Sequence, residues 1–125
     1  MIDPKNYIQR GFSAVRPYLH GPIELPAFLQ NVFNATEIER NDDGPTLLQI
    51  DDSLVWIEAG DLPENIDPWV GSVYAYVEDV DSVYERAIEA GARGIAAPED
   101  KPYLERQAGF VDPGGNTWWV SKYLG

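Results

Sequence analysis

The chain has 125 residues, of which 44% are hydrophobic and 24% charged, and it contains no cysteine. This length and composition favour one folded domain, and the lack of cysteine excludes disulfides, thiolate nucleophiles and thiolate-bound metals. Nine basic against 21 acidic residues give a formal charge of −12. Such acidity argues against a nucleic-acid partner, because phosphate binding depends on Lys and Arg.

Membrane and export segments are not expected either. No stretch approaches the ~20 apolar residues of a membrane span, and the N-terminal residues lack the basic start and apolar run of a signal peptide. With no export signal and no disulfides, we expect a cytoplasmic protein without a membrane partner. Residues 1–11 match no pattern and are interpreted as an N-terminal arm.

The first half of the chain predicts a strand, a helix and three more strands. A strand over 12–19 precedes a helix whose apolar residues recur at helical spacing, namely Leu25, Phe28, Leu29, Val32 and Phe33. Further strands are predicted over 35–40, 46–50 and 53–59. Residues 60–71, with Gly60, Pro63 and Pro68, are interpreted as a connection between two halves.

The second half repeats this order. A strand over 72–77 leads into a helix with Val80, Val83, Tyr84, Ala87 and Ile88 on one face. Strands over 94–97, 105–111 and 116–123 follow, the last two joined by the turn Asp112-Pro113-Gly114-Gly115. Tyr18-Leu19 and Tyr76-Val77 are interpreted as equivalent strand ends. We therefore predict an α+β domain over 12–125, in which two βαβββ modules (about 12–60 and 71–123) form one curved mixed sheet with both helices outside.

Alternation along the strands separates an aliphatic face from an aromatic one. The aliphatic residues are natural partners for the helices. The other face mixes large aromatic and polar side chains, as small-molecule cavities do. These aromatics could instead fill the inside of a small sheet or form a dimer contact. The residues concerned are Arg16, Tyr18, Gln49, Trp56, Glu58, Ser72, Tyr74, Tyr76 and Trp119.

Glu58 is the only carboxylate that this assignment places on the aromatic face. Its charge would be costly there unless paired, and Arg16 is the candidate partner. A structural ion pair and a ligand-holding pair both remain open. The neighbouring Trp and Tyr rings could stack on a cationic or planar group. His20, the only histidine, is interpreted as a residue at a strand end rather than as a catalytic base.

Two stretches carry a resemblance to a known family. Residues 74–92 read YAYVEDVDSVYERAIEAGA, and residues 106–118 read RQAGFVDPGGNTW. Both resemble the vicinal-oxygen-chelate superfamily, which contains glyoxalase I, bleomycin-resistance proteins, extradiol dioxygenases and fosfomycin-resistance enzymes. The resemblance covers about residues 12–123, is most specific in the DPGGNTW hairpin, and is nearest to small glyoxalase-like and bleomycin-resistance-like members. It implies the two-module fold and a homodimer, and it adds Arg106 to the site.

Metal-dependent members of this superfamily place ligands on four strands. Carried over residue by residue, the resemblance puts these ligand positions at Arg16, Glu58, Ser72 and Trp119. Only Glu58 is a conventional ligand, because Arg is a cation and Trp has no lone pair to donate. We therefore expect no metal and no other cofactor.

These observations predict a metal-free protein that binds a hydrophobic or cationic aromatic small molecule in an aromatic cleft, similar to the drug-sequestering proteins of antibiotic resistance. An alternative is a glyoxalase-like lyase or isomerase that uses Glu58 as a general base. A third possibility is a protein-interaction module whose aromatic face is the interface. The predicted ligand-binding residues are Arg16, Tyr18, Trp56, Glu58, Ser72, Tyr74, Tyr76, Arg106 and Trp119.

Overall fold

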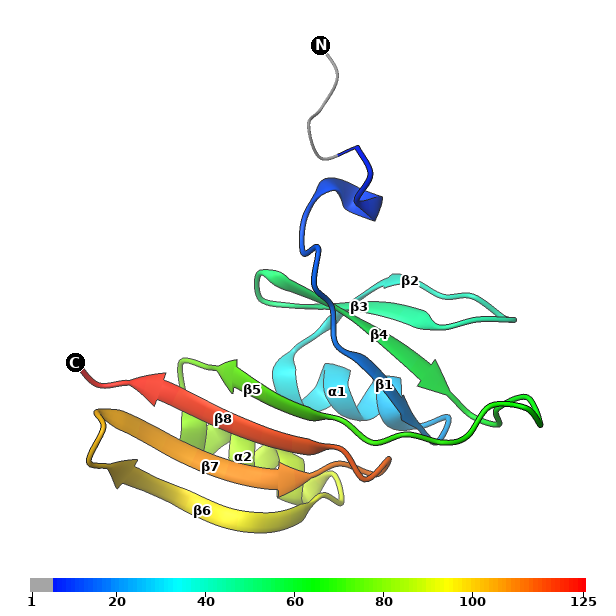
Figure 1. Cartoon of the computed structure of the whole chain (residues 1–125). Coiled ribbons are helices and arrows are strands. Elements are labelled where there is room, and N and C mark those ends of the chain that lie inside the picture. Colours follow the sequence, from blue (N-terminus) through cyan, green and yellow to red (C-terminus); the bar gives the residue numbers. More distant parts are fainter. Residues whose placement is uncertain (1–5) are drawn as a thin grey trace.

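The two halves of the chain fold into the same succession of elements (Figure 1). The computed structural model describes residues 6–125. The first module contains β1 (Tyr18–Gly21), α1 (Leu25–Phe33), β2 (Thr36–Glu39), β3 (Thr46–Ile50) and β4 (Ser53–Ala59). The second contains β5 (Ser72–Tyr76), α2 (Val80–Glu89), β6 (Arg93–Lys101), β7 (Glu105–Val111) and β8 (Thr117–Tyr123). The α+β class and the two βαβββ modules are confirmed.

The eight strands are divided between two mixed sheets. Sheet A has the order β1-β4-β3-β2, and sheet B has the order β5-β8-β7-β6. In each sheet the first strand of the module runs parallel to the last, whereas the remaining pairs are antiparallel. Within residues 6–125 no strand pair joins the two sheets, so the larger curved surface is made of two four-stranded sheets side by side rather than one hydrogen-bonded sheet.

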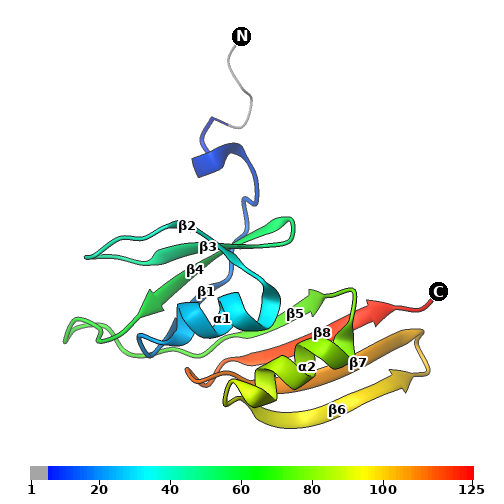
Figure 2. The ribbon, with the colours of Figure 1, turned by 180° about the vertical axis from the view of Figure 1, so that it is seen from behind.

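Both helices lie on the same side of the sheets (Figure 2). Helix α1 begins with Pro26 in its first turn and ends at Asn34 in the left-handed conformation (φ 55°), as such a cap requires. Helix α2 begins at Asp79, whose side chain accepts a hydrogen bond from the Ser82 backbone N–H. Arg86 of α2 donates two hydrogen bonds, of 3.0 and 2.9 Å, to the Val32 carbonyl near the end of α1. The helices are therefore tied to each other as well as to the sheets.

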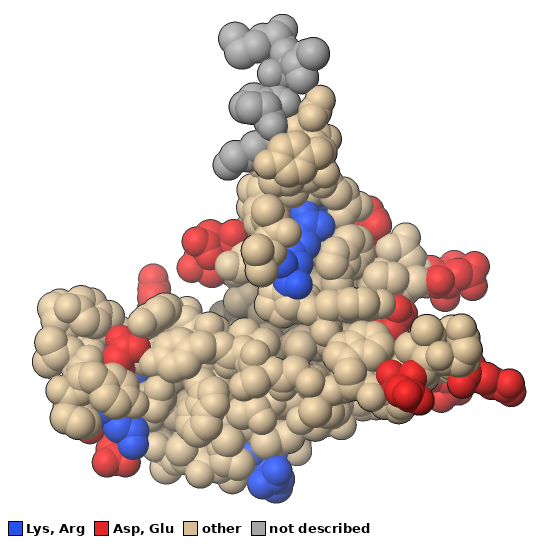
Figure 3. All heavy atoms as spheres, viewed as in Figure 1, with Lys and Arg blue, Asp and Glu red and all other residues tan. Residues whose placement is uncertain are grey.

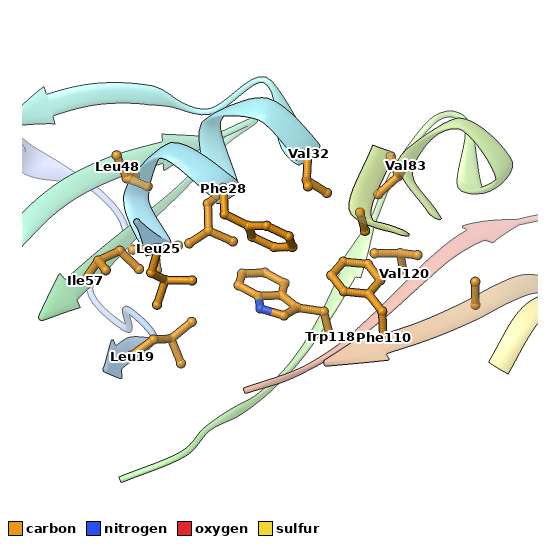
Figure 4. Close-up of a cluster of buried hydrophobic side chains, with 14 of the residues drawn as sticks. Leu19, Leu25, Phe28, Val32, Leu48, Ile57, Val83, Phe110, Trp118 and Val120 are labelled. Atoms are coloured by element: carbon orange, nitrogen blue, oxygen red, sulfur yellow. The ribbon is translucent and has the colours of Figure 1, made fainter. Parts of the chain in front are cut away.

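One hydrophobic core is shared by the two modules (Figure 4). The α1 residues Phe28 and Phe33 meet Phe110 and Trp118 from β7 and β8, with a Phe33–Trp118 centroid distance of 4.8 Å. Trp118 is only 1% exposed. Because large aromatic side chains contribute much of the apolar area that a small domain buries, the two modules stabilise each other and form one folding unit.

A buried hairpin between β7 and β8 also joins the modules. The amide of Asn116 donates to the His20 carbonyl (3.0 Å) and accepts from the Gly71 backbone N–H (2.8 Å). Asp112 holds this turn in shape and accepts a hydrogen bond from the Trp118 indole (2.9 Å). A Cβ atom on Gly114 would lie 2.5 Å from the His20 carbonyl oxygen, so this close approach requires glycine.

The structure corrects the expected ends of two strands. Residues 12–17 do not form a strand, because Pro17 has no N–H, Ser13 has a positive φ of 60°, and β1 begins only at Tyr18. Strand β6 extends to Lys101 rather than ending at 97, and its pairing with β7 contains two register shifts. Residues 12–17 therefore lie outside the sheet. No helix in the described part of the chain is long and apolar enough to cross a membrane.

Replacing Asn116 by Ala should destabilise the protein by about 3 kcal/mol, because the partly buried His20 carbonyl and Gly71 N–H lose their hydrogen bonds to the amide. Urea unfolding followed by far-ultraviolet circular dichroism measures this change. Asn65→Ala, which removes an exposed amide in the connection between the modules, is the matched control and should change the unfolding free energy by less than ~0.5 kcal/mol. Equal stability of the two variants would contradict the role assigned to Asn116.

Candidate functional site

The side of each sheet that faces away from the helices carries the aromatic residues. We call these surfaces open face A and open face B. Tyr18 of β1 lies beside Trp56 of β4, and Tyr74 of β5 lies beside Trp119 of β8. The modules thus repeat one Tyr–Trp pair. Seen from this side, most of the surface is uncharged, and acidic side chains lie mainly towards its rim (Figure 3).

This repeat corrects the equivalence inferred from the sequence. Tyr18 corresponds to Tyr74, not to Tyr76, because each lies beside the tryptophan of the parallel strand. The difference is two residues, so the side chains still lie on the expected face. Strand register is set by the partner strand, and the partners are distant in sequence.

On open face A, a tyrosine orders a carboxylate. The Tyr18 hydroxyl donates a 2.7 Å hydrogen bond to Glu58 Oε1. This bond, together with partial burial and the negative charge of Glu58, raises the pKa of Tyr18 to about 12. Tyr18 therefore remains a hydrogen-bond donor throughout the physiological pH range, and Glu58 presents its other oxygen to the open face.

Trp69 forms a wall that the sequence analysis missed. Its indole N–H donates to the Tyr18 carbonyl (2.7 Å), and its ring lies 4.9 Å from that of Tyr18 and 5.4 Å from that of His20. The available signal was a tryptophan within a Pro-rich, acidic connection, where a large apolar ring is unusual unless it packs on something. Trp69 thus fixes the connection against the edge of sheet A.

Arg16 does not pair with Glu58, so that prediction is wrong. Its guanidinium instead donates to the backbone carbonyls of Ser13 (2.9 Å), Phe12 (3.2 Å) and Gln9. It also lies 5.9 Å from the Trp56 ring centroid, within cation–π range. The physical reason is that Arg16 precedes β1, in a segment that curls around the guanidinium. None of the ion pairs between described residues includes Glu58.

The segment 7–17 folds over open face A and leaves a cleft beneath it. Leu47 and Leu54 lie on this side of sheet A but are fully buried, and the Leu54 N–H donates to the Ser13 hydroxyl (3.1 Å). The cleft has a volume of about 620 Å³ and is lined by arm residues together with Arg16, Tyr18 and Trp56. Three predicted site residues are therefore brought together here.

Open face B contains a second carboxylate, Glu105, which the sequence analysis did not place there. Glu105 Oε1 accepts hydrogen bonds from the Tyr74 hydroxyl (2.7 Å) and the Ser121 hydroxyl (3.0 Å). Tyr76 packs edge-on against Tyr74, with centroids 5.6 Å apart. Alternation along β7 would have found Glu105, because the next residue, Arg106, points to the helix side.

Two further predicted residues complete open face B. Trp119 lies against Gly109, where a Cβ atom would meet the indole ring at 2.5 Å, so glycine creates the space for this ring. Ser72 is exposed at the start of β5, two residues before Tyr74. Tyr74, Tyr76, Ser72 and Trp119 thus share one face, as expected.

Arg106 lies apart from both open faces. It donates to the two Asp81 carboxylate oxygens in the first turn of α2 (2.7 and 2.9 Å) and to Asp100 (2.9 Å). These carboxylates hold the pKa of Arg106 above its usual value. Arg106 therefore anchors α2 to sheet B, and the structure does not bring it together with the other predicted ligand-binding residues.

The residues at the four expected metal positions do not fit a divalent ion. Arg16 offers only donors, Trp119 has no lone pair to give, and the Ser72 hydroxyl is a poor ligand without companions. Within residues 6–125, no three His, Cys, Asp or Glu side chains gather closely enough to hold a metal. These four positions therefore do not form a conventional site for a divalent metal ion.

A family model of the Glyoxalase/Bleomycin resistance protein/Dioxygenase superfamily matches residues 25–120. The chain therefore belongs to this superfamily. The match begins at α1 and ends within β8, so it includes both helices and the DPGGNTW hairpin. None of the curated proteins compared with the sequence matches it closely enough to serve as a relative.

Solved structures share the fold. TioX from Micromonospora sp. ML1 is 21% identical over 89% of this chain and 100% of its own, with a TM-score of 0.70. A superfamily enzyme from Burkholderia phytofirmans PsJN is 24% identical over 88% and 96%, with a TM-score of 0.68. A bleomycin resistance determinant encoded on transposon Tn5 is 20% identical over 90% and 98%, with a TM-score of 0.64. At these identities the likeness shows the fold alone.

Arg16→Met should release the segment over open face A while the rest of the fold persists, because the carbonyls of that segment lose their common donor. We expect chymotrypsin to cut after Tyr7 or Phe12 about tenfold faster than in the unmodified protein. Arg10→Met is the matched control, since the one side-chain contact of Arg10 with other described residues is an exposed ion pair with Glu39 (3.2 Å). If both variants were cut at the same rate, Arg16 would not be the anchor.

Proposed function

We propose that this protein binds a hydrophobic or cationic aromatic small molecule on its open faces, without a metal ion. The observation that carries the proposal is the 620 Å³ cleft, in which Trp56 and Tyr18 form an aromatic floor beneath the segment 7–17. That volume lies in the range of small-molecule sites, and aromatic walls with few polar groups are typical of them. Tyr74, Tyr76, Ser72 and Trp119 offer a second surface of the same character.

The polar groups that line the cleft, and Glu58 beside it, are arranged for orientation rather than for chemistry. Arg16 is engaged by backbone carbonyls and one face of Trp56, so it shapes the cleft instead of offering a free charge. Tyr18 and Glu58 form a fixed donor–acceptor pair at 2.7 Å. A planar ligand would stack on the Trp56 and Tyr18 rings, while a donor group on it would meet Glu58.

A homodimer is part of this proposal. In the described part of the chain, the cleft beneath the segment 7–17 contains Trp56 but none of the residues of open face B. A second copy could set its open face B against open face A and so enclose a ligand from both sides. Light scattering on the purified protein should then give twice the mass of the 14.0 kDa chain. We propose a cytoplasmic location with it, in line with the absence of disulfides.

The alternative is a glyoxalase-like lyase or isomerase with Glu58 as the general base. The hydrogen bond from Tyr18 favours it in one respect, because an oriented carboxylate on an open face is what proton abstraction needs. The superfamily protein from Burkholderia phytofirmans is itself described as an enzyme. Stoichiometric Zn, Ni, Mn or Fe in the purified protein, or turnover that Glu58→Gln abolishes, would favour this alternative over simple binding.

Trp56→Ala should weaken the binding of proflavine, a planar aromatic cation, by about tenfold, because it removes the main stacking surface of the cleft. Isothermal titration calorimetry gives the dissociation constants. Ile88→Ala truncates a partly exposed apolar side chain of α2, on the helix side, and should leave the affinity unchanged. Binding that is insensitive to Trp56→Ala, or no binding of proflavine at all, would refute the cleft on open face A and favour a protein interface there.

A further inference from the structure

We propose that Glu105 and the tyrosines around it form a recognition site for an alkylammonium group on open face B. The inference rests on the proposed function and sharpens it, because it names the chemical group that open face B selects and the residue that selects it. The site is built from residues of β5, β7, β8 and the turn before β7. Their side chains belong to open face B, which is the face of sheet B opposite α2.

The central observation is a buried carboxylate with one idle oxygen. Glu105 is 6% exposed, and its hydrogen bonds from Tyr74 and Ser121 both go to Oε1. Oε2 is the one buried side-chain nitrogen or oxygen in residues 6–125 that has no hydrogen-bond partner. A buried, unsatisfied acceptor costs roughly 1–3 kcal/mol, and more when it is charged.

Glu105 is charged, and the described residues provide no counter-ion for it. The hydroxyl of Tyr74, and to a lesser extent that of Ser121, keeps the pKa of Glu105 below its usual value, so the carboxylate is ionised at neutral pH. No ion pair found between described residues includes it. Because an ionised group is stable in such surroundings only when it is paired, an incoming cation would supply what the fold leaves out.

The hydrogen-bond chain behind the carboxylate makes the site selective for donors. Tyr103 donates to Gln107 Oε1 (3.0 Å), Gln107 Nε2 donates to the Tyr74 oxygen (3.0 Å), and Tyr74 donates to Glu105 (2.7 Å). In each of these three hydrogen bonds the donor hydrogen is directed along the series towards the carboxylate of Glu105. The remaining oxygen can therefore only accept, so it suits an ammonium N–H and repels carboxylates and phosphates.

Aromatic rings cover the carboxylate and add to the attraction for a cation. Tyr74 and Tyr76 are 47% and 62% exposed, and their rings meet edge to face at 64°. The pKa of the Tyr76 phenol is raised, chiefly by a hydrogen bond with Glu105 and by partial burial, so this side chain stays protonated beside the carboxylate. Exposed side chains change rotamer rapidly, so Tyr76 can turn aside to admit an ammonium group and then offer it a ring face.

Open face A has no equivalent of this arrangement. Its carboxylate, Glu58, is only partly buried and receives one tyrosine hydroxyl, and the guanidinium of Arg16 lies over the neighbouring Trp56 ring. The two faces consequently differ in selectivity, and the preference for an amine resides in sheet B.

The test compares phenethylamine with phenethyl alcohol, which has a similar shape without the charge. We expect the amine to bind the unmodified protein at least about tenfold more tightly than the alcohol in calorimetric titrations. Glu105→Gln should reduce this ratio to about one, because it removes the charge and keeps the size of the side chain. Glu89→Gln, which neutralises an exposed carboxylate of α2 on the helix side, is the matched control and should leave the ratio unchanged. An equal ratio in the unmodified protein and in Glu105→Gln would overturn the proposal.

A second measurement uses the unmodified protein, so its result does not depend on whether the variant folds. In amide proton–nitrogen NMR spectra, phenethylamine should shift resonances of residues 72–76, 103–107 and 119–123. Shifts confined to residues 16–18 and 54–58, or no binding of the amine, would refute the site at Glu105. If the site at Glu105 were refuted but Trp56→Ala still weakened proflavine binding, the proposed cleft on open face A would stand. The two proposals can therefore fail independently.

Discussion

The amide of Asn116 holds the two modules together, and the arrangement of both open faces depends on it. This side chain is fully buried and bonds at once to the carbonyl at the end of β1 and to the N–H before β5. These are the strands that carry Tyr18 and Tyr74. Because no strand pair joins the sheets in the described chain, the edges of sheets A and B are positioned by this hairpin and by the shared aromatic core, not by a continuous ladder.

Placing both helices on one side leaves the other side of the sheets free for recognition. The aliphatic residues of the strands pack against α1 and α2, so no helix covers the aromatic residues on the opposite face. The modules keep one Tyr–Trp pair each but surround it differently. On sheet A the segment 7–17 and Arg16 cover the pair, whereas on sheet B a buried carboxylate lies beneath the tyrosines. One duplicated fold thus provides two chemically distinct surfaces.

Local patterns predicted the elements well, because they depend on residues close together in the chain. The helical spacing of Leu25 to Phe33 and the DPGGNTW turn both lie where expected. Predictions that depended on distant partners were less secure. Arg16 was assigned to Glu58 on strand parity alone, but its segment does not enter the sheet. Trp69 was missed because its role appears only when the connection packs against sheet A. The face of Glu105 follows from alternation along β7, but its hydrogen bonds to Tyr74 and Ser121 depend on how the strands pack together.

The sequence by itself determined the α+β class, the two modules and the face on which the aromatic residues lie, since periodicity and turn chemistry are local properties. The superfamily followed from the resemblance of residues 74–92 and 106–118 to known members. Only the tertiary structure decided which charges meet. Arg16 donates hydrogen bonds to backbone carbonyls, and Arg106 donates to Asp81. Glu105 is buried, and none of the described residues supplies a cation for it. The physical reason is that the pairing of a charge depends on the few ångströms around its tip, and those are set by residues far away in the chain.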